Sequence, residues 1–143
     1  MVINTYGPTE AAIAVSFYNI YISNEINKLL TIPIGSTVYN TDLSIINNDG
    51  YILNQYERGI LFISGKQFGG GYYKRKRKTA ISFTPIFDTN NSIDVAERNY
   101  NTGDEVYINS DNYIEYLGRI DSQDKRNGQR MEVEEVAHCF TKE

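Results

Sequence analysis

The stretch from Asn4 to Glu10 contains a turn that restricts the path of the chain close to its beginning. The dipeptide Gly7-Pro8 forces this turn, because proline fixes one backbone angle and glycine adopts angles that other residues avoid. An aromatic ring, Tyr6, precedes the turn, and a hydroxyl and a carboxylate, Thr9 and Glu10, follow it. The ring offers a flat face to a base, and the backbone at a glycine can approach a ligand closely. This combination predicts a nucleotide site.

Two further motifs follow about a hundred residues later, the segments Asn101–Asp104 and Gly118–Asp121. They supply a carboxylate, Asp104, and a guanidinium beside it, Arg119. The two oxygens of a carboxylate have the spacing of a vicinal diol, and each charge-assisted hydrogen bond stabilises a complex by roughly 1.5 to 3 kcal/mol. We therefore expect Asp104 to accept the hydroxyls of a sugar.

Length and composition favour one soluble domain and exclude several classes of protein. A chain of 143 residues can bury roughly two thirds of its unfolded surface. A net charge of −4 gives no global attraction to nucleic acid or to anionic membranes. The single cysteine, Cys139, excludes an intrachain disulfide and a multi-cysteine metal site. No apolar run approaches the ~20 residues of a membrane span and no secretory signal begins the chain, so we expect a cytoplasmic location.

The hydrophobic pattern predicts a mainly β fold. The apolar run Ile13–Phe17 reads as a strand, and the middle of the chain reads as hairpins, with strands at Asp42–Ile46 and Gly59–Ser64 and a turn at Asn47–Gly50. A further pair of strands is expected at 105–109 and 113–117, separated by a polar turn.

One helix is expected, over Val133–Phe140, where apolar residues recur at helical spacing and glutamates favour its beginning. The architecture predicted from the pattern is therefore β with a helical tail.

The segment Lys74–Lys78 carries five consecutive positive charges. Such a run invites a nucleic-acid interpretation, but the chain is acidic and salt screens an exposed loop strongly, so a solvated loop is favoured. The triple glycine Gly69–Gly71 before it reads as a turn. It is not a phosphate-binding loop, because no hydroxyl residue follows a Gly-Lys pair.

The three polar motifs, in this order, resemble the later core motifs of adenylate-forming ligases. They are most similar to the amino-acid adenylation domains of nonribosomal peptide synthetases and to the related D-alanyl carrier protein ligases. The pattern N-x-Y-G-P-T-E at Asn4–Glu10 is specific to the amino-acid-activating branch, and Gly69–Tyr73 matches a further motif of the family. The resemblance covers almost the whole chain.

The resemblance implies an α+β, mainly β fold that corresponds to a fragment of the family's structure. Residues 1–120 would be the last part of the large N-terminal AMP-binding domain, which ends in a small distorted β-barrel subdomain. Residues 121–143 would be the hinge, at Asp121, and the beginning of the C-terminal lid. A polar linker and a short helix normally follow the glycine-rich motif in this family.

The same resemblance implies roles for individual residues. Thr9 would contact the α-phosphate and Glu10 would hold Mg²⁺, with the alternative that this pair only caps a turn. The nucleotide ATP or AMP would be bound by an adenine-stacking tyrosine, its glycine neighbour, a ribose carboxylate and two flanking residues: Tyr6, Gly7, Asp104, Tyr116 and Arg119. Tyr6 and Tyr116 have the alternative of ordinary packing.

The remaining implied positions belong to the amino acid and to the carrier. Thr5, Ile13 and Ala14 match positions that line the amino-acid pocket, and Gly128 matches a loop that approaches the phosphopantetheine arm of a peptidyl or D-alanyl carrier protein. No nucleic-acid or membrane partner is expected. Asp124 and Arg126 depart from the family pattern, because two apolar residues usually stand at their positions.

The implied reaction has two steps, formation of an aminoacyl adenylate from ATP and transfer of the acyl group to a carrier thiol. Catalysis would rest on positioning and electrostatics. Family members supply positive charge from an upstream loop and from a lysine late in the lid, and neither is in this sequence, so we expect no catalysis by the 143 residues alone. The alternatives are a non-catalytic module that binds a nucleotide or a carrier, and a small nucleic-acid binder.

Overall fold

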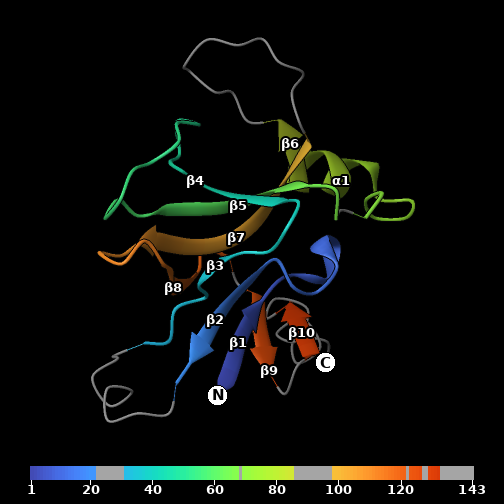
Figure 1. The fold of residues 1–143 in the computed structure, drawn as a ribbon. Helices are drawn as coiled ribbons and strands as arrows, with labels where there is room; N and C mark the ends of the chain where they lie inside the picture. Colours follow the sequence, from blue (N-terminus) through green and yellow to red (C-terminus); the bar gives the residue numbers. More distant parts are fainter. Residues whose placement is uncertain (22–30, 68, 86–97, 122, 127–128, 133–143) are drawn as a thin grey trace, which may run out of the picture.

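The computed structural model describes residues 1–21, 31–67, 69–85, 98–121, 123–126 and 129–132, and its strands form three antiparallel sheets (Figure 1). The largest sheet has the order β4-β5-β7-β6, with β8 paired to β7. Its strands are β4 (Thr41–Ile46), β5 (Gly59–Gly65), β6 (Phe83–Pro85), β7 (Arg98–Ile108) and β8 (Ile114–Arg119).

Both predicted hairpins are confirmed. Strand β4 pairs with β5, and β7 pairs with β8. Strand β7 is longer than predicted, since it begins at Arg98 and also pairs with β5 and β6. The ladders of β7 shift register at two places, next to Ile60 and next to Glu105, which marks irregular pairing around the middle of this strand.

A second sheet has the order β1-β2-β3, from β1 (Val2–Tyr6), β2 (Ser16–Ile20) and β3 (Ser36–Thr37). The prediction of a strand over Ile13–Phe17 is wrong at its beginning. The short 3-10 helix η1 (Thr9–Ala11) is followed by Ala12 and Ile13 in left-handed conformations, with φ of 55° and 79°. Because these angles are incompatible with an extended strand, pairing starts only at Ser16.

The basic run does not form only a loop. Helix α1 (Lys76–Ser82) begins within it, so Lys76, Arg77 and Lys78 form the first turn of a helix that buries none of its side chains. This corrects the prediction of a solvated loop, although all five basic side chains are exposed as expected.

The third sheet is a hairpin of β9 (Gln123–Arg126) and β10 (Gln129–Glu132). The segment that carries Asp124 and Arg126 therefore forms a strand despite its departure from the apolar pattern. The predicted helix at Val133–Phe140, Cys139 and the carrier-side residue Gly128 lie outside the described residues.

The core consists of two hydrophobic clusters along β5. One contains Ala11, Val15, Ile63, Phe83 and Tyr100, and the other contains Ile34, Ile45, Leu61, Val106 and Ile114. Tyr6 packs against both clusters, which places the end of β1 where the two sheets meet. The sheets are also joined by backbone hydrogen bonds between Ile114 and residues 34 and 35.

We predict that Gly35→Ala destabilises the fold more than Gly50→Ala does. Both glycines have left-handed angles, with φ of 86° and 89°, but a Cβ at Gly35 would lie 1.9 Å from the carbonyl oxygen of Phe17, whereas a Cβ at Gly50 meets nothing within 4 Å. Gly50→Ala should therefore cost only the backbone term of about 1–2 kcal/mol, and Gly35→Ala about 1–3 kcal/mol more. Urea unfolding of the two variants measures the difference, and equal losses would contradict the prediction.

Candidate functional site

Three strands from two sheets meet at the carboxylate of Asp104. This side chain is almost fully buried, with the residue 5% exposed. The Tyr6 hydroxyl, at the end of β1, donates to Asp104 Oδ2, and Arg119 Nη1, at the end of β8, donates to Asp104 Oδ1 over 2.8 Å. The structure therefore brings together the ring, the carboxylate and the guanidinium that the three motifs predicted.

The local backbone fixes the direction of Asp104. The Thr102 hydroxyl donates to the carbonyl of Leu61 over 2.8 Å and accepts the amide N–H of Asp104 over 3.0 Å. The side chain of Asn101 accepts the amide N–H of Gly103 over 2.9 Å. The two bonds to amide N–H groups within the Asn-Thr-Gly-Asp motif hold a turn-like segment inside a long strand, and the bond to Leu61 ties this segment to β5.

Arg119 joins two carboxylates. Its Nε and Nη2 atoms donate to the two oxygens of Asp121 over 2.6 and 2.7 Å, while Nη1 bonds Asp104. The hydrogen bonds to Asp121 and the charge of Asp104 raise the pKa of the Arg119 guanidinium, although partial burial opposes this. The cation is therefore fixed in place by a bidentate pair on one side and a buried carboxylate on the other.

Tyr6 is held as a neutral hydrogen-bond donor. Burial is the first cause that raises the pKa of its hydroxyl, and the charge of Asp104 and the hydrogen bond to it raise the pKa further. The Tyr6 side chain thus combines a ring in contact with the core and a hydroxyl committed to Asp104. The alternative prediction for Tyr6, ordinary packing, describes part of its environment, because the ring packs against both core clusters.

A second polar group surrounds Glu10. The Tyr72 hydroxyl donates to Glu10 Oε1 over 2.5 Å, and the amide N–H of Gly69 donates to the Glu10 carbonyl over 3.0 Å. Burial and the hydrogen bond to Glu10 raise the pKa of Tyr72. Both predicted phosphate-side residues lie in η1, where Pro8 is the N-terminal cap and no side chain caps the helix, so the capping alternative for Thr9 and Glu10 is not observed.

The other predicted residues are placed with different degrees of exposure. Thr9 and Thr5 are exposed, and Tyr116 is 40% exposed on β8. Ile13 is 76% exposed and Ala14 is half-buried, both in the turn before β2. The structure leaves the roles of these residues as predictions.

Sequence reasoning missed two residues of the site. Asp121 was predicted as a hinge and not as the partner of Arg119. The spacing Arg-x-Asp at the end of a predicted strand could have indicated this ion pair. Tyr72 was assigned only to a motif, and no local pattern could indicate its contact with a residue 62 positions earlier.

An open cleft of about 850 Å³ lies between α1, the first half of β7 and the end of β8. It is lined by Tyr72, Lys74–Lys78, Ile81, Ser82, Tyr100–Gly103 and Arg119–Asp121. No cluster of three or more acidic, histidine or cysteine side chains suited to a metal ion occurs among the described residues. A search of the same part of the chain finds no helix that is long and apolar enough to cross a membrane.

Comparison with known proteins gives relatives over nearly the whole chain. It is 35% identical to gramicidin S synthase 1 of Brevibacillus brevis over 140 aligned residues. These residues are 98% of this chain and 12% of the synthase. It is 37% identical to the D-alanine--D-alanyl carrier protein ligase of Bacillus licheniformis over 138 aligned residues. These residues are 96% of this chain and 25% of the ligase. The chain therefore spans a quarter or less of these relatives. No family model matches it.

Solved structures agree with these relatives. The Vibrio cholerae adenylation domain AlmE, in complex with glycyl-adenosine-5'-phosphate, superposes with a TM-score of 0.77 and 33% identity over 94% of this chain and 24% of that one. A nonribosomal peptide synthetase protein containing adenylation and PCP domains superposes with a TM-score of 0.86 over 98% of this chain and 27% of that one, at 23% identity. The second likeness shows the fold, and the predicted mainly β class is confirmed.

We predict that Tyr6 limits stability at alkaline pH. An unfolded tyrosine ionises near pH 10, whereas folded Tyr6 keeps its proton, so its contribution to the free energy of unfolding is complete below about pH 10 and is lost as the pH rises further. Tyr6→Phe should lower stability by about 1–3 kcal/mol at neutral pH, because a buried acceptor loses a donor. Its stability should then fall less steeply above pH 10.

Urea unfolding at several pH values measures both effects. Tyr39→Phe is the matched control, since it removes a hydroxyl from a ring that is 87% exposed. Identical alkaline profiles for Tyr6→Phe and the unaltered chain would contradict the assignment.

Proposed function

We propose that the described residues of this chain form part of an ATP-binding surface. The premise is that the chain belongs to the amino-acid-activating family of adenylate-forming enzymes. The observation that carries the proposal is the buried Asp104 carboxylate at the meeting point of Tyr6 and Arg119. This arrangement supplies an acceptor for ribose hydroxyls, a nearby ring for the base and a cation that pairs with the acceptor.

The ribose would bind at Asp104. A carboxylate offers about four lone-pair sites, and the structure uses one for Tyr6 and one for Arg119. The 2′ and 3′ hydroxyls would therefore be accepted beside these bonds or in place of the Tyr6 hydroxyl. Tyr6 and the partly exposed ring of Tyr116 would flank this position. The space beside Gly7 is taken by the backbone of Ile13, since a Cβ at Gly7 would lie 2.3 Å from the Ile13 carbonyl oxygen, so a nucleotide contact of Gly7 stays a prediction.

The phosphates would lie toward Thr9 and Glu10. Mg²⁺ commonly takes one or two carboxylates and completes its shell with substrate phosphates and water, so the single carboxylate of Glu10 suits a metal that is shared with ATP. Tyr72 bonds Oε1 and so orients this carboxylate. When bound, Mg²⁺ would neutralise phosphate charge, and the exposed Thr9 hydroxyl would contact the α-phosphate.

The whole protein would form an aminoacyl adenylate and transfer the acyl group to a carrier protein through a phosphopantetheine thiol. In this proposal residues 1–120 belong to the large domain, and residues 121–143 begin the lid, with the hinge at Asp121. Thr5, Ile13 and Ala14 would contribute to the amino-acid pocket, and Gly128 to the carrier-side loop. The relatives at 35% and 37% identity, one from each branch, support amino-acid activation in general and not one amino acid.

We predict that the 143-residue chain binds AMP with a dissociation constant of about 1 mM or weaker, and binds 2′,3′-dideoxy-AMP at least about tenfold more weakly. Base stacking of about 1–3 kcal/mol and one or two charged hydrogen bonds barely offset an association entropy of ~4 kcal/mol or more. Loss of both hydroxyls removes the bonds to Asp104.

Titration of amide chemical shifts by nuclear magnetic resonance measures both ligands on the same sample. Equal affinity for AMP and the dideoxy nucleotide would show that Asp104 does not bind ribose. Micromolar AMP affinity by calorimetry would overturn the expected weakness of the isolated chain.

A further inference from the structure

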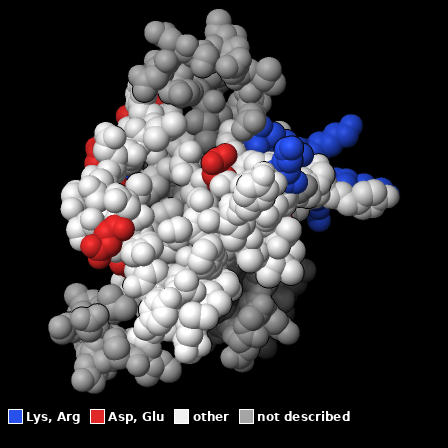
Figure 2. All heavy atoms as spheres, in the orientation of Figure 1, with Lys and Arg blue, Asp and Glu red and all other residues white. Residues whose placement is uncertain are grey.

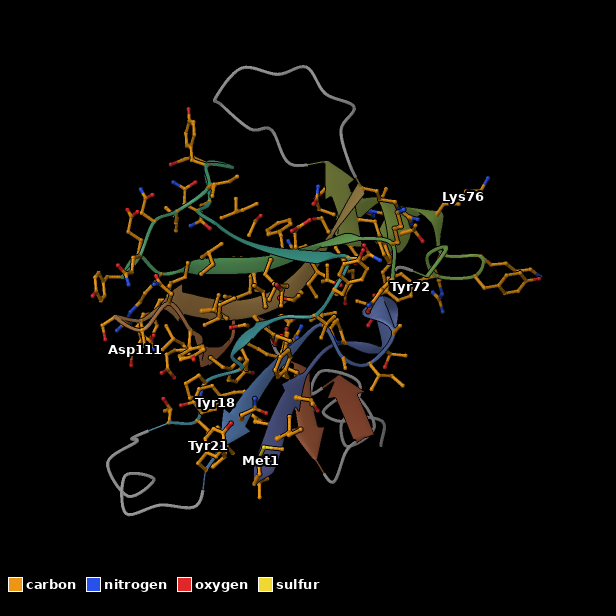
Figure 3. The ribbon with its side chains drawn as sticks, in the orientation of Figure 1. Met1, Tyr18, Tyr21, Tyr72, Lys76 and Asp111 are labelled. Atoms are coloured by element: carbon orange, nitrogen blue, oxygen red, sulfur yellow. The ribbon has the colours of Figure 1, made fainter. Side chains whose placement is uncertain are left out.

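The glycine-rich segment Gly69–Tyr72 holds Glu10 at two points. The amide N–H of Gly69 donates to the main-chain carbonyl of Glu10 over 3.0 Å, and the Tyr72 hydroxyl donates to its Oε1 over 2.5 Å. Figure 3 shows Tyr72 beside the η1 turn, which contains Glu10. The main chain and the carboxylate of this half-buried residue are therefore both held by one remote segment.

Arg98, the first residue of β7, fixes the glycine-rich segment from outside. Its Nη2 and Nη1 atoms donate to the carbonyls of Gly70 and Gly69 over 3.2 and 3.5 Å. The guanidinium also stacks over the Phe83 ring, with 4.2 Å between Cζ and the ring centre. A planar guanidinium presents several donors in a fixed fork and stacks on a ring at the same time, whereas a lysine ammonium is a point charge. Arg98 therefore anchors the segment to β6 and β7.

Thr79, on α1, fixes the last part of the segment. Its hydroxyl accepts the amide N–H of Tyr72 over 2.9 Å. A Cβ at Gly71 would lie 2.5 Å from Thr79 Cγ2 and 3.3 Å from Arg98 Nη2, so the chain passes between these two side chains in close contact. The Tyr72 ring packs edge to face against Phe83, with ring centres 6.1 Å apart. Because both its backbone and its ring are fixed, the hydroxyl of Tyr72 has a defined position.

The basic run Lys74–Lys78 directly follows this segment, and its charge is a competing explanation for any effect of the segment on a metal or on ATP. All five side chains are exposed, and in Figure 2 the Lys and Arg side chains gather on the side of the molecule where α1 lies. Salt screens exposed charges strongly, whereas hydrogen bonds depend on geometry. A substitution that keeps the charge and loses the geometry therefore separates the two explanations.

We propose that Arg98 and Tyr72 are positioning residues for the Glu10 carboxylate. Arg98 acts through the glycine-rich segment, and Tyr72 acts directly through its hydrogen bond to Oε1. Hydrogen-bond partners orient the carboxylates that ligate metals and tune their affinity for the metal. The inference rests on the proposed function, because it requires that Glu10 holds Mg²⁺ shared with ATP. Neither residue is assigned a contact with the nucleotide, so their effect should depend on the metal.

The test measures the ATP affinity of the 143-residue chain with and without Mg²⁺ by titration of amide chemical shifts. The metal gain is the ratio of the two affinities, and Glu10→Gln gives its baseline, in which Mg²⁺ acts only through the charge of ATP. Tyr72→Phe should lower the metal gain toward this baseline by at least about threefold, because the carboxylate loses one hydrogen bond. Affinity for AMP without Mg²⁺ should change by less than about twofold, since the contacts of Asp104 are unaltered.

Substitutions behind Tyr72 test the role of the segment. Arg98→Lys keeps the positive charge and should also lower the metal gain by at least about threefold, because a lysine cannot bond both carbonyls and stack on the ring. Thr79→Val should lower the metal gain, and Thr79→Ser, which keeps the hydroxyl acceptor, should retain it. The matched controls are Tyr73→Phe, on a ring that is 85% exposed, and Arg58→Lys, on an exposed side chain. Both controls should change the metal gain by less than about twofold.

Two results would overturn the positioning role. An unchanged metal gain in Tyr72→Phe or Arg98→Lys, beside a lost gain in Glu10→Gln, would remove the role of that residue and keep Glu10 as the metal ligand. A loss of AMP affinity equal to the loss of metal gain would show damage to the fold in place of a metal-dependent effect.

The inference and the proposed function fail separately. A metal gain in the unaltered chain no larger than that of Glu10→Gln would remove the metal assignment of Glu10, and the positioning role with it. Discrimination between AMP and its dideoxy analogue would still report on Asp104 alone. Equal affinity for these two nucleotides, with a metal gain that Tyr72→Phe lowers, would remove the ribose assignment and keep the positioning role.

Discussion

The buried charge of Asp104 is the constraint on which the rest of the site depends. An unpaired carboxylate in this position would cost several kcal/mol, so the fold must bring it partners. Tyr6 arrives from the first sheet and Arg119 from β8, and both bond the same carboxylate. Tyr6 is the last residue of β1 and Arg119 is the last residue of β8. The bonds that these two side chains make to Asp104 therefore also fix how the two sheets meet. The acceptor proposed for ribose is thus ordered before any ligand arrives.

Arg119 extends this constraint to the end of the large sheet. Its guanidinium bonds Asp104 with one nitrogen and Asp121 with the other two. A ligand that donates hydrogen bonds to Asp104 would share its lone pairs with Arg119, while Asp121 holds the guanidinium on the other side. In the proposed function Asp121 is the hinge, so the ribose site and the hinge share one cation. In that proposal the Arg119 side chain would link the nucleotide site to the lid.

The sequence predicted the elements that depend on local patterns. Alternating residues and polar turns indicated the pairing of β4 with β5 and of β7 with β8, and three short motifs indicated the side chains that meet at Asp104. The beginning of β2 was not predictable in this way. A Cβ at Gly7 would lie 2.3 Å from the Ile13 carbonyl oxygen, so the two segments pass in close contact and Ile13 turns away from the extended conformation. That contact joins residues in a loop and leaves no periodic signal.

The glycine-rich segment shows how a feature read only as a turn acquires a second role from the fold. Arg98 stacks over the Phe83 ring at 4.2 Å and donates to the carbonyl of Gly70, and the Thr79 hydroxyl accepts the amide N–H of Tyr72. These bonds hold the segment against α1 and β7, which brings the Gly69 amide to the Glu10 carbonyl and the Tyr72 hydroxyl to its carboxylate. Glu10 is therefore oriented from a distant part of the sequence. The same segment that positions the proposed metal ligand leads directly into helix α1.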